Sequence, residues 1–334
     1  MLGEFGNVMV TPDNYYMASR SALDGVSFYK DSSFYSFDQF DLYLNRPDIV
    51  LGRLGYAAPE LLNFYRNAYL KRFKKMNGNL ADTSLDKPVP SLKLMDKKSI
   101  AVVTQSGLQP LSFEITDTAC AMGELTIFIN GNRLKQSSIT LPAAGMFIYR
   151  DSLLLGQGLN NIEAVYKNCA ALESRKEKLA LTYSPIKKIE TKVWFIGIGI
   201  SRYKDASMNL KYPVKDIRDI AADFKKKYPG LIIDTLLDGN ATRQQLLALH
   251  DKLMKTGIND KVIVSFSGHG LLSDSLNWYF ATHDIDFKKP ELNGLSYDMM
   301  EGILSGIPAR RKLLLLDACH SGEVDKETDI TFEN

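Results

Sequence analysis

Two residues of this sequence, His269 and Cys319, have the side chains and the surroundings that nucleophilic catalysis requires. His269 lies in Ser-Gly-His-Gly at 267–270, and Cys319 lies in Asp-Ala-Cys-His-Ser-Gly at 317–322. The small neighbours let a substrate and the backbone come close. An imidazole beside a cysteine stabilises the thiolate and can then protonate a leaving amine. We therefore predict a Cys-His dyad, with backbone N–H groups near Gly270 and Cys319 holding the oxyanion.

Each of the two motifs follows a short apolar run, at residues 261–267 and 312–317. Such runs are typical of strands that are buried on both faces of a parallel sheet. The carboxyl ends of neighbouring parallel strands meet at one edge of the sheet, where reactive groups of such proteins gather. The pattern therefore predicts that the two motifs lie together, although they are far apart in the sequence.

Residues 190–334 as a whole alternate between strand and helix patterns. Apolar runs also occur at 192–200 and 231–237, and helical periodicity occurs at 213–228, 242–254 and 296–304. This alternation implies right-handed crossovers and a mostly parallel sheet with helices on its faces. The fold class predicted for this part is α/β.

Ser-Gly-His-Gly followed 50 residues later by Asp-Ala-Cys-His-Ser-Gly resembles the caspase superfamily, over about residues 190–325. The form Asp-x-Cys-His-Ser-Gly is more similar to metacaspases and their bacterial relatives than to animal caspases, which have Gln-Ala-Cys-x-Gly. The resemblance implies a caspase-like fold and a cysteine endopeptidase, a hydrolase that acts on a protein or peptide substrate.

The resemblance to metacaspases also implies cleavage after Arg or Lys. The acidic pocket of that family corresponds here to Asp317, two residues before Cys319, and to Asp216, with Ser267 at a third pocket position. A carboxylate pair favours a guanidinium through charge-assisted bonds. Pro213 and Lys215 depart from the family's Leu-x-Gly-x-x-Asn-Asp pattern, and the lysine puts the preference for a cation in doubt.

Calcium activates many metacaspases, and here Asp284 and Asp286 follow the catalytic His at about the expected place. A calcium ion needs roughly six oxygen ligands, and no second acidic cluster is evident. Zinc spacing is absent as well, because one Cys-His pair is not a ligand set. We expect no metal or cofactor, and calcium activation stays open as an alternative.

The caspase fold normally continues beyond the nucleophile with two more strands, whereas residues 323–334 are acidic and polar. The resemblance therefore implies that the peptidase domain is incomplete at its C-terminus. A C-terminal small subunit is the expected partner.

Upstream of this domain, residues 93–185 read as a succession of short strands with turn residues between them. Asn130-Gly131 is a hairpin signal, and the spacing of the turns suits an immunoglobulin-like β-sandwich. We expect a spacer or docking domain here.

Residues 1–92 form an N-terminal region of strand fragments, helices and a linker. Residues 1–45 have β-like pieces and no room for a core of their own, helices begin near Pro47 and Pro59, and 80–92 read as a linker. The tract 43–51 resembles the region that follows a WD-repeat propeller in bacterial multidomain caspase-like proteins.

Composition excludes several other classes of protein. The formal charge of +2 is no footprint for nucleic acid, and no run approaches the roughly 20 apolar residues of a membrane span. No signal peptide is visible at the start of the sequence.

Three cysteines leave at least one thiol free, so we expect Cys120 and Cys169 to be buried apolar fillers and the protein to be cytoplasmic.

The alternative function is a non-catalytic caspase-fold scaffold or interaction module. A serine hydrolase is excluded, because the parallel-sheet region has no Gly-x-Ser-x-Gly elbow. Among the other histidines, His320 is expected to support the structure. His250 and His283 have no partner that the sequence identifies.

Overall fold

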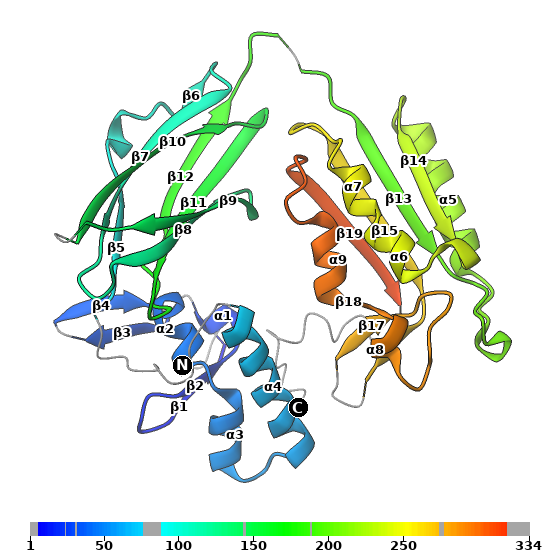
Figure 1. Ribbon diagram of the computed structural model, residues 1–334, viewed down its shortest axis with the longest axis horizontal. Helices are drawn as coiled ribbons and strands as arrows, with labels where there is room; N and C mark the ends of the chain where they lie inside the picture. The colour runs from blue at the N-terminus through cyan, green and yellow to red at the C-terminus, as the bar shows by residue number, and fades with distance from the viewer. Residues whose placement is uncertain are drawn as a thin grey trace.

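The computed structural model describes residues 6–23, 25–30, 32–75, 88–142, 145–187, 189–273 and 277–318. The chain forms an N-terminal part of small strands and helices, a β unit of two sheets, and an α/β unit with a parallel sheet (Figure 1). Among the described helices, none is both long and apolar enough to cross a membrane.

The described residues of the N-terminal part form two hairpins and four helices. Its elements are β1 (Val8–Val10), β2 (Tyr16–Ala18), α1 (Arg20–Leu23), β3 (Ser27–Lys30), β4 (Ser33–Ser36), α2 (Phe37–Leu44), α3 (Pro47–Leu54) and α4 (Pro59–Lys75). Pro47 and Pro59 open their helices, where the missing N–H costs nothing. Helix α2 lies in a stretch for which the sequence predicted only strand fragments. Its capping box, formed by Ser36 and Gln39, satisfies the first backbone N–H groups.

The core of the N-terminal part includes residues from the β unit. Tyr16, Phe40, Tyr43 and Phe73 are buried together with residues 170–172. The Tyr43 hydroxyl donates a hydrogen bond to the Ala170 carbonyl. The two parts therefore share one hydrophobic cluster.

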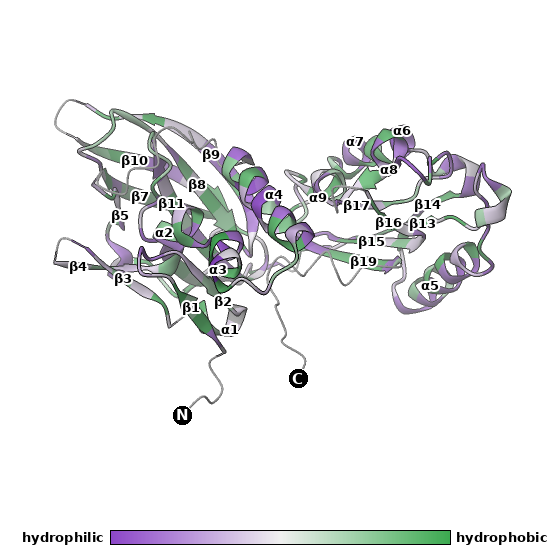
Figure 2. Cartoon of the chain, turned by 90° about the horizontal axis from the view of Figure 1, so that it is seen from below, coloured by the Kyte–Doolittle hydropathy of each residue, from purple (hydrophilic) through white to green (hydrophobic). Residues whose placement is uncertain are grey.

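The β unit is built from a three-stranded and a five-stranded sheet around one core. The strand orders are β10-β7-β5 and β6-β12-β11-β8-β9. The elements are β5 (Ser91–Leu94), the 3₁₀ turn η2 (Lys97–Ser99), β6 (Val103–Thr104), β7 (Leu108–Thr116), β8 (Met122–Ile129), β9 (Asn132–Thr140), β10 (Met146–Leu154), β11 (Gly158–Asn168) and β12 (Glu177–Tyr183). Alternate residues of β7 and β8 are buried in the shared core. Figure 2 colours the strands of both sheets by hydropathy.

Strand β5 begins inside the segment that the sequence predicted as linker. Leu92 is 6% exposed and Leu94 is 5% exposed, because both point into the core between the sheets. The nearby prolines suggested a linker, but they precede the strand and do not interrupt it.

Cys120 and Cys169 form a disulfide, so the prediction that they are unpaired apolar fillers is wrong. Strands β8 and β11 are antiparallel neighbours, and their register pairs Gly123 with Asn168. The segments just before β8 and just after β11 therefore meet, which places the two Cα atoms 5.8 Å apart. An odd cysteine count does not exclude such a pair when long-range strand pairing aligns two of the thiols.

The α/β unit contains a four-stranded parallel sheet in the order β14-β13-β15-β19, as expected from the alternating pattern. Its elements are β13 (Val193–Gly199), η3 (Ala206–Met208), α5 (Pro213–Lys227), β14 (Ile232–Leu237), η4 (Asp238–Asn240), α6 (Arg243–Leu247), α7 (Leu249–Leu253), β15 (Lys261–Gly268), β16 (Gly270–Leu272), β17 (Trp278–Phe280), α8 (Pro290–Asn293), β18 (Leu295–Ser296), α9 (Tyr297–Leu304) and β19 (Arg311–Ala318).

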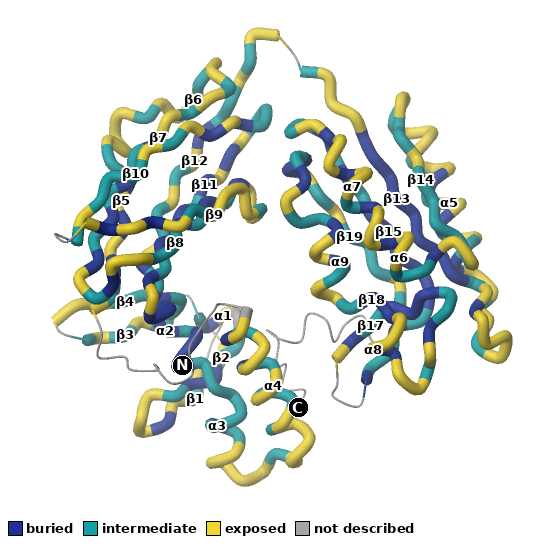
Figure 3. Tube along the Cα trace, in the orientation of Figure 1, coloured by how far each residue is buried: buried dark blue, intermediate teal, exposed yellow. Residues whose placement is uncertain are grey.

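Helix α5 covers one face of this sheet, and α6, α7 and α9 cover the other. Strand β13 is buried along its whole length (Figure 3). At Gly199 an added Cβ would lie 2.9 Å from the Pro213 carbonyl oxygen, so only glycine lets α5 begin this close to the strand. This contact brings the start of α5 to the carboxyl edge of the sheet.

Two local features of the α/β unit differ from the sequence prediction. The helix expected over 242–254 is divided at Ala248 into α6 and α7, with Thr242 as its N-cap. A small antiparallel sheet, β16-β17-β18, lies between β15 and β19 along the chain. Its strands have two or three residues each, too short for an alternating pattern to reveal them.

The disulfide yields a prediction about stability. Replacing both Cys120 and Cys169 by Ser should lower the free energy of unfolding by about 2–4 kcal/mol, because the unfolded chain gains the entropy of an open 49-residue loop. Urea unfolding of the full chain, with and without a thiol reductant, measures the effect. The matched control is Cys319→Ser, which should keep the sensitivity to reductant. Equal midpoints in oxidised and reduced wild-type protein would contradict the prediction.

Candidate active site

His269 is the residue directly after β15, and hydrogen bonds fix both its backbone and its ring. Its N–H donates to the Tyr203 hydroxyl at 2.9 Å, and its Nε2 lies 2.9 Å from the Met208 carbonyl oxygen. A carbonyl only accepts, so Nε2 carries the hydrogen of this bond. In the neutral imidazole Nδ1 is then the proton acceptor. The geometry therefore assigns the tautomer and leaves Nδ1 as the basic atom.

Two aromatic rings hold the imidazole in place. The Tyr203 and His269 ring centroids are 5.2 Å apart, and Phe287 meets the imidazole edge-on at 5.6 Å. Tyr203 is 4% exposed, and burial raises the pKa of its phenol to about 12. At neutral pH the hydroxyl is therefore protonated and uncharged.

The loop that carries the Met208 carbonyl is anchored to neighbouring loops. One carboxylate oxygen of Asp238 accepts from the Ser201 N–H at 2.8 Å and the Arg202 N–H at 2.9 Å. The Tyr203 N–H donates to the Asn209 side chain at 2.8 Å. His283, for which the sequence identified no partner, has its Nδ1 2.6 Å from the Arg202 carbonyl oxygen. The acceptor for His269 is thus part of a hydrogen-bonded loop.

The pairing of β15 with β19 aligns the two predicted catalytic motifs. The register is parallel and sets Ser267 opposite Asp317 and Gly268 opposite Ala318. The Ser267 hydroxyl donates to the Asp317 carboxylate at 3.1 Å. His269 and Cys319 are the next residues along the two strands, although Cys319 lies outside the described residues.

Gly268 is needed because the backbone packs closely here. An added Cβ would lie 2.9 Å from the Tyr203 hydroxyl and 3.2 Å from the Phe280 ring. The Tyr203 hydroxyl is also the acceptor of the His269 N–H. The glycine in Ser-Gly-His-Gly therefore has a packing role beside the predicted dyad.

The amide of Gly270 points away from β17. The Ala281 N–H donates to the His269 carbonyl at 2.9 Å, and Gly270 is opposite Phe280 in the antiparallel register. Hydrogen-bonded and non-hydrogen-bonded pairs alternate in such a ladder. Gly270 and Phe280 are then a non-hydrogen-bonded pair, which leaves the Gly270 N–H directed to the other side of β16.

Asp216 lies in the first turn of α5, at the carboxyl edge of the sheet. Among the described residues no hydrogen bond joins its carboxylate to Ser267 or Asp317. Lys215, the departure from the family pattern, forms an ion pair with Asp219 one turn along the helix. The structure thus brings Ser267 and Asp317 together and leaves Asp216 as a separate prediction.

The two acidic residues considered for calcium have local partners. Asp284 accepts from the Thr282 hydroxyl at 3.1 Å, and Asp286 accepts from the N–H of Lys288 at 2.9 Å. Within the described ranges no group of three or more His, Cys, Asp or Glu side chains is placed to hold a metal. Two aspartates alone do not supply the oxygens that calcium needs.

Sequence reasoning identified His269 but not the groups that orient it. Tyr203, Met208 and Asp238 belong to loops that carry no motif, and the Met208 contribution is a backbone carbonyl. The one feature of the sequence that could have indicated these groups is Tyr203, a tyrosine within the polar loop after β13. His250, for which the sequence identified no partner, has its Nδ1 3.3 Å from the Ile303 carbonyl oxygen.

The α/β unit thus has an oriented imidazole directly beyond β15, at the carboxyl edge of its parallel sheet, where ligands of such sheets bind. Residues 195–333 match the family described as "Caspase domain". This part of the chain is therefore similar to caspase domains. The predicted relation of residues 43–51 to a WD-repeat protein stays a prediction.

Similarity to solved structures is weak. The fibronectin(III)-like modules of Clostridium thermocellum CbhA share 11% identity and a TM-score of 0.24, over 30% of this chain and 51% of theirs. A CARDB domain from Pyrococcus furiosus shares 12% identity and a TM-score of 0.22, over 29% of this chain and 93% of that domain. A PKD domain from a Thermoplasmatales archaeon peptidase shares 17% identity and a TM-score of 0.20, over 29% and 93%. Such scores support no argument, and no curated protein matches this chain.

The support of His269 by Tyr203 is testable. Tyr203→Phe removes the acceptor of the His269 N–H and should lower the free energy of unfolding by about 1 kcal/mol. Urea unfolding of the full chain measures the change. The control is Tyr212→Phe, because Tyr212 is 56% exposed and should tolerate the change. An equal effect of the two substitutions would show that the hydrogen bond contributes nothing.

Proposed function

We propose that this chain is a cysteine endopeptidase in which Cys319 is the nucleophile and His269 is the general base. The observation that carries the proposal is the hydrogen bond from His269 Nε2 to the Met208 carbonyl, which leaves Nδ1 as the acceptor. The register of β15 with β19 supports it, since the residues preceding His269 and Cys319 are paired.

The proposed reaction proceeds by acyl transfer. Nδ1 of His269 takes the proton of the Cys319 thiol, and the sulfur attacks the scissile carbonyl. The amides of Gly270 and Cys319 stabilise the oxyanion. The imidazolium then returns its proton to the leaving amine, and water hydrolyses the thioester to free the enzyme.

We further propose a preference for Arg or Lys before the scissile bond, as in metacaspases. The Asp317 carboxylate is exposed, and its Oδ2 accepts from Ser267. That bond orients the carboxylate and leaves Oδ1 for a guanidinium. Asp216 is the second carboxylate of the proposed pocket. Lys215, which lies next to Asp216, would repel a bound cation, but its charge is partly neutralised by the ion pair with Asp219.

A C-terminal small subunit is proposed to cover β19. Within the described residues this strand pairs on one side only, with β15. Leu313 on this strand is 49% exposed. An edge with free backbone groups and apolar side chains favours an added strand.

For the cellular compartment, we base our proposal on the cysteines. The sequence led us to expect the cytoplasm, but the pair Cys120–Cys169 supports an oxidising compartment, where disulfides persist. Among the described residues the bond lies beside the core shared by the N-terminal part and the β unit.

The nucleophile is tested by Cys319→Ala. We expect hydrolysis of Arg-linked and Lys-linked fluorogenic peptides to fall by at least about 10³-fold, because the substitution removes the attacking sulfur. The same loss is expected for His269→Ala, whereas His250→Gln, a change at a structural histidine, should retain the activity. Unchanged hydrolysis by Cys319→Ala would rule out the proposed dyad.

Specificity is tested by Asp317→Asn. We expect kcat/KM for Arg-linked peptides to fall about 10-fold or more, because a charge-assisted hydrogen bond is lost. The control is Asp223→Asn, which removes an acidic charge further along α5, where Asp223 is exposed and paired with Lys226. A wild-type preference for Asp or Glu before the scissile bond would show that Asp216 and Asp317 do not form a cation pocket.

A further inference from the structure

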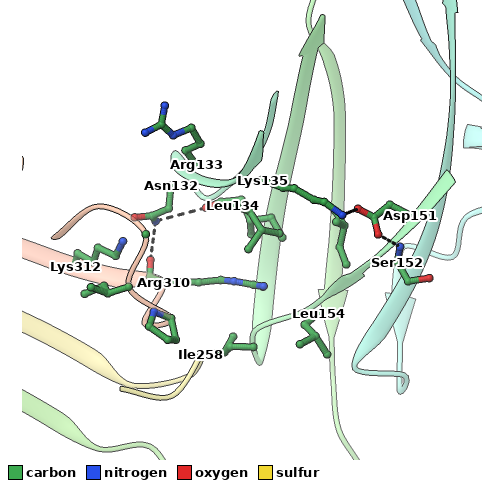
Figure 4. A pocket seen from close by; sticks show the side chains of 15 residues that line it. Asn132, Arg133, Leu134, Lys135, Asp151, Ser152, Leu154, Ile258, Arg310 and Lys312 are labelled. Atoms are coloured by element: carbon green, nitrogen blue, oxygen red, sulfur yellow. Dashed lines mark hydrogen bonds and ion pairs between the residues drawn. The ribbon is translucent and has the colours of Figure 1, made fainter. Parts of the chain in front are cut away.

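A cavity of about 360 Å³ lies between the β unit and the α/β unit, away from His269. Figure 4 shows side chains from β9 and β10 on one side and from the segments around Ile258 and Arg310 on the other. The two units are joined beside it. Asn132 donates to the Arg310 carbonyl at 2.9 Å, and the Gln157 N–H donates to the Asn259 side chain at 2.6 Å. The cavity is therefore part of a hydrogen-bonded interface.

Arg310 extends its guanidinium into this cavity and is almost fully buried. The residue is 7% exposed, and its Nη1 is buried without a hydrogen-bond partner. Within the described part of the chain no carboxylate forms an ion pair with it. Burial lowers the pKa of the guanidinium to about 10, which still leaves it charged at neutral pH. A buried cation with an unused donor is costly unless another group accepts from it.

Lys312 supplies a second cation to the same cavity. Its Nζ donates one hydrogen bond, to the Leu304 carbonyl at 2.7 Å, so two of its three hydrogens are available for other acceptors. Burial lowers the pKa of this ammonium to about 8. The pKa shift has the direction expected when no carboxylate compensates the charge.

The charges around the cavity do not balance. Arg133 and Lys135 of β9 line it together with Arg310 and Lys312, and Asp151 of β10 is the acidic lining residue. Asp151 is engaged with Lys135 at 2.6 Å. The lining of the cavity therefore carries an excess of positive charge. Arg310, the most deeply buried of these cations, has an Nη1 group without a hydrogen-bond acceptor.

We propose that this cavity binds the oxyanion of a small ligand, a carboxylate or a phosphate group, between Arg310 and Lys312. The planar fork of a guanidinium fits either oxyanion. The cavity volume is in the range of small-molecule sites, and its walls include apolar side chains such as Ile307 and Leu153. Because both units line the site, a bound anion bridges them and stabilises their docking.

Calorimetric titration of the full chain with sodium phosphate and with sodium succinate, against sodium chloride at equal ionic strength, tests the site. We expect saturable binding of at least one oxyanion, and the tighter one identifies the class of ligand. Affinity should fall as pH rises through about 8, where Lys312 loses its proton. Binding stabilises the charged form of Lys312, so proton uptake is expected near that pH. The titration measures anion binding and not peptidase activity. Absence of binding would therefore leave the proposed function standing, and absence of peptidase activity would leave the anion site standing.

Arg310→Met should weaken the binding about 10-fold or more, since it removes the buried fork. Lys312→Met should weaken it and abolish the pH dependence, and it keeps the test decisive if Arg310→Met does not fold. The matched control is Arg218→Met, an exposed arginine on α5 outside the cavity, which should bind as wild type. Absence of saturable binding by the wild type, or equal affinity in all three variants, would overturn the proposal.

Discussion

The candidate active site depends on the parallel register between β15 and β19. Side chains alternate along a strand, so a slip of one residue would turn every one of them to the opposite face. In the observed register Ser267 is opposite Asp317, and the hydrogen bond between them lies at the edge where the two motifs begin. The alignment is maintained by burial of the central strands, since residues 262, 264 and 266 of β15 are each 1% exposed.

The strand register does not determine which ring nitrogen of His269 carries the hydrogen. The Met208 carbonyl determines it by accepting from Nε2, and the Asp238 carboxylate holds the loop that contains Met208. The proposed base is therefore defined by backbone groups that belong to the connection after β13. Substitutions in this connection can therefore change the tautomer of His269 without altering His269 or Cys319 themselves.

The parallel sheet could be predicted because apolar runs mark buried strands directly. His269 and Cys319 could be proposed because glycines and small residues bound each motif, and the family match over 195–333 includes both positions, while their catalytic role stays a prediction. Tyr203 and Met208 could not be predicted, because their roles come from contacts across more than 60 positions of the chain, as the separations of 66 and 61 residues show. The disulfide was missed for a related reason, since only the pairing of β8 with β11 brings Cys120 near Cys169.

The hydrophobic cluster shared by the N-terminal part and the β unit has a consequence for dividing the chain. Residues 170–172 complete the packing around Phe40 and Phe73, so a fragment that started at residue 93 would leave the apolar surface of those residues uncovered. The sequence suggested a boundary at that point, but cooperative unfolding should instead unite everything up to β12. A cut between β12 and β13 would keep this cluster whole, but it would separate the partners of the Asn132–Arg310 and Gln157–Asn259 hydrogen bonds.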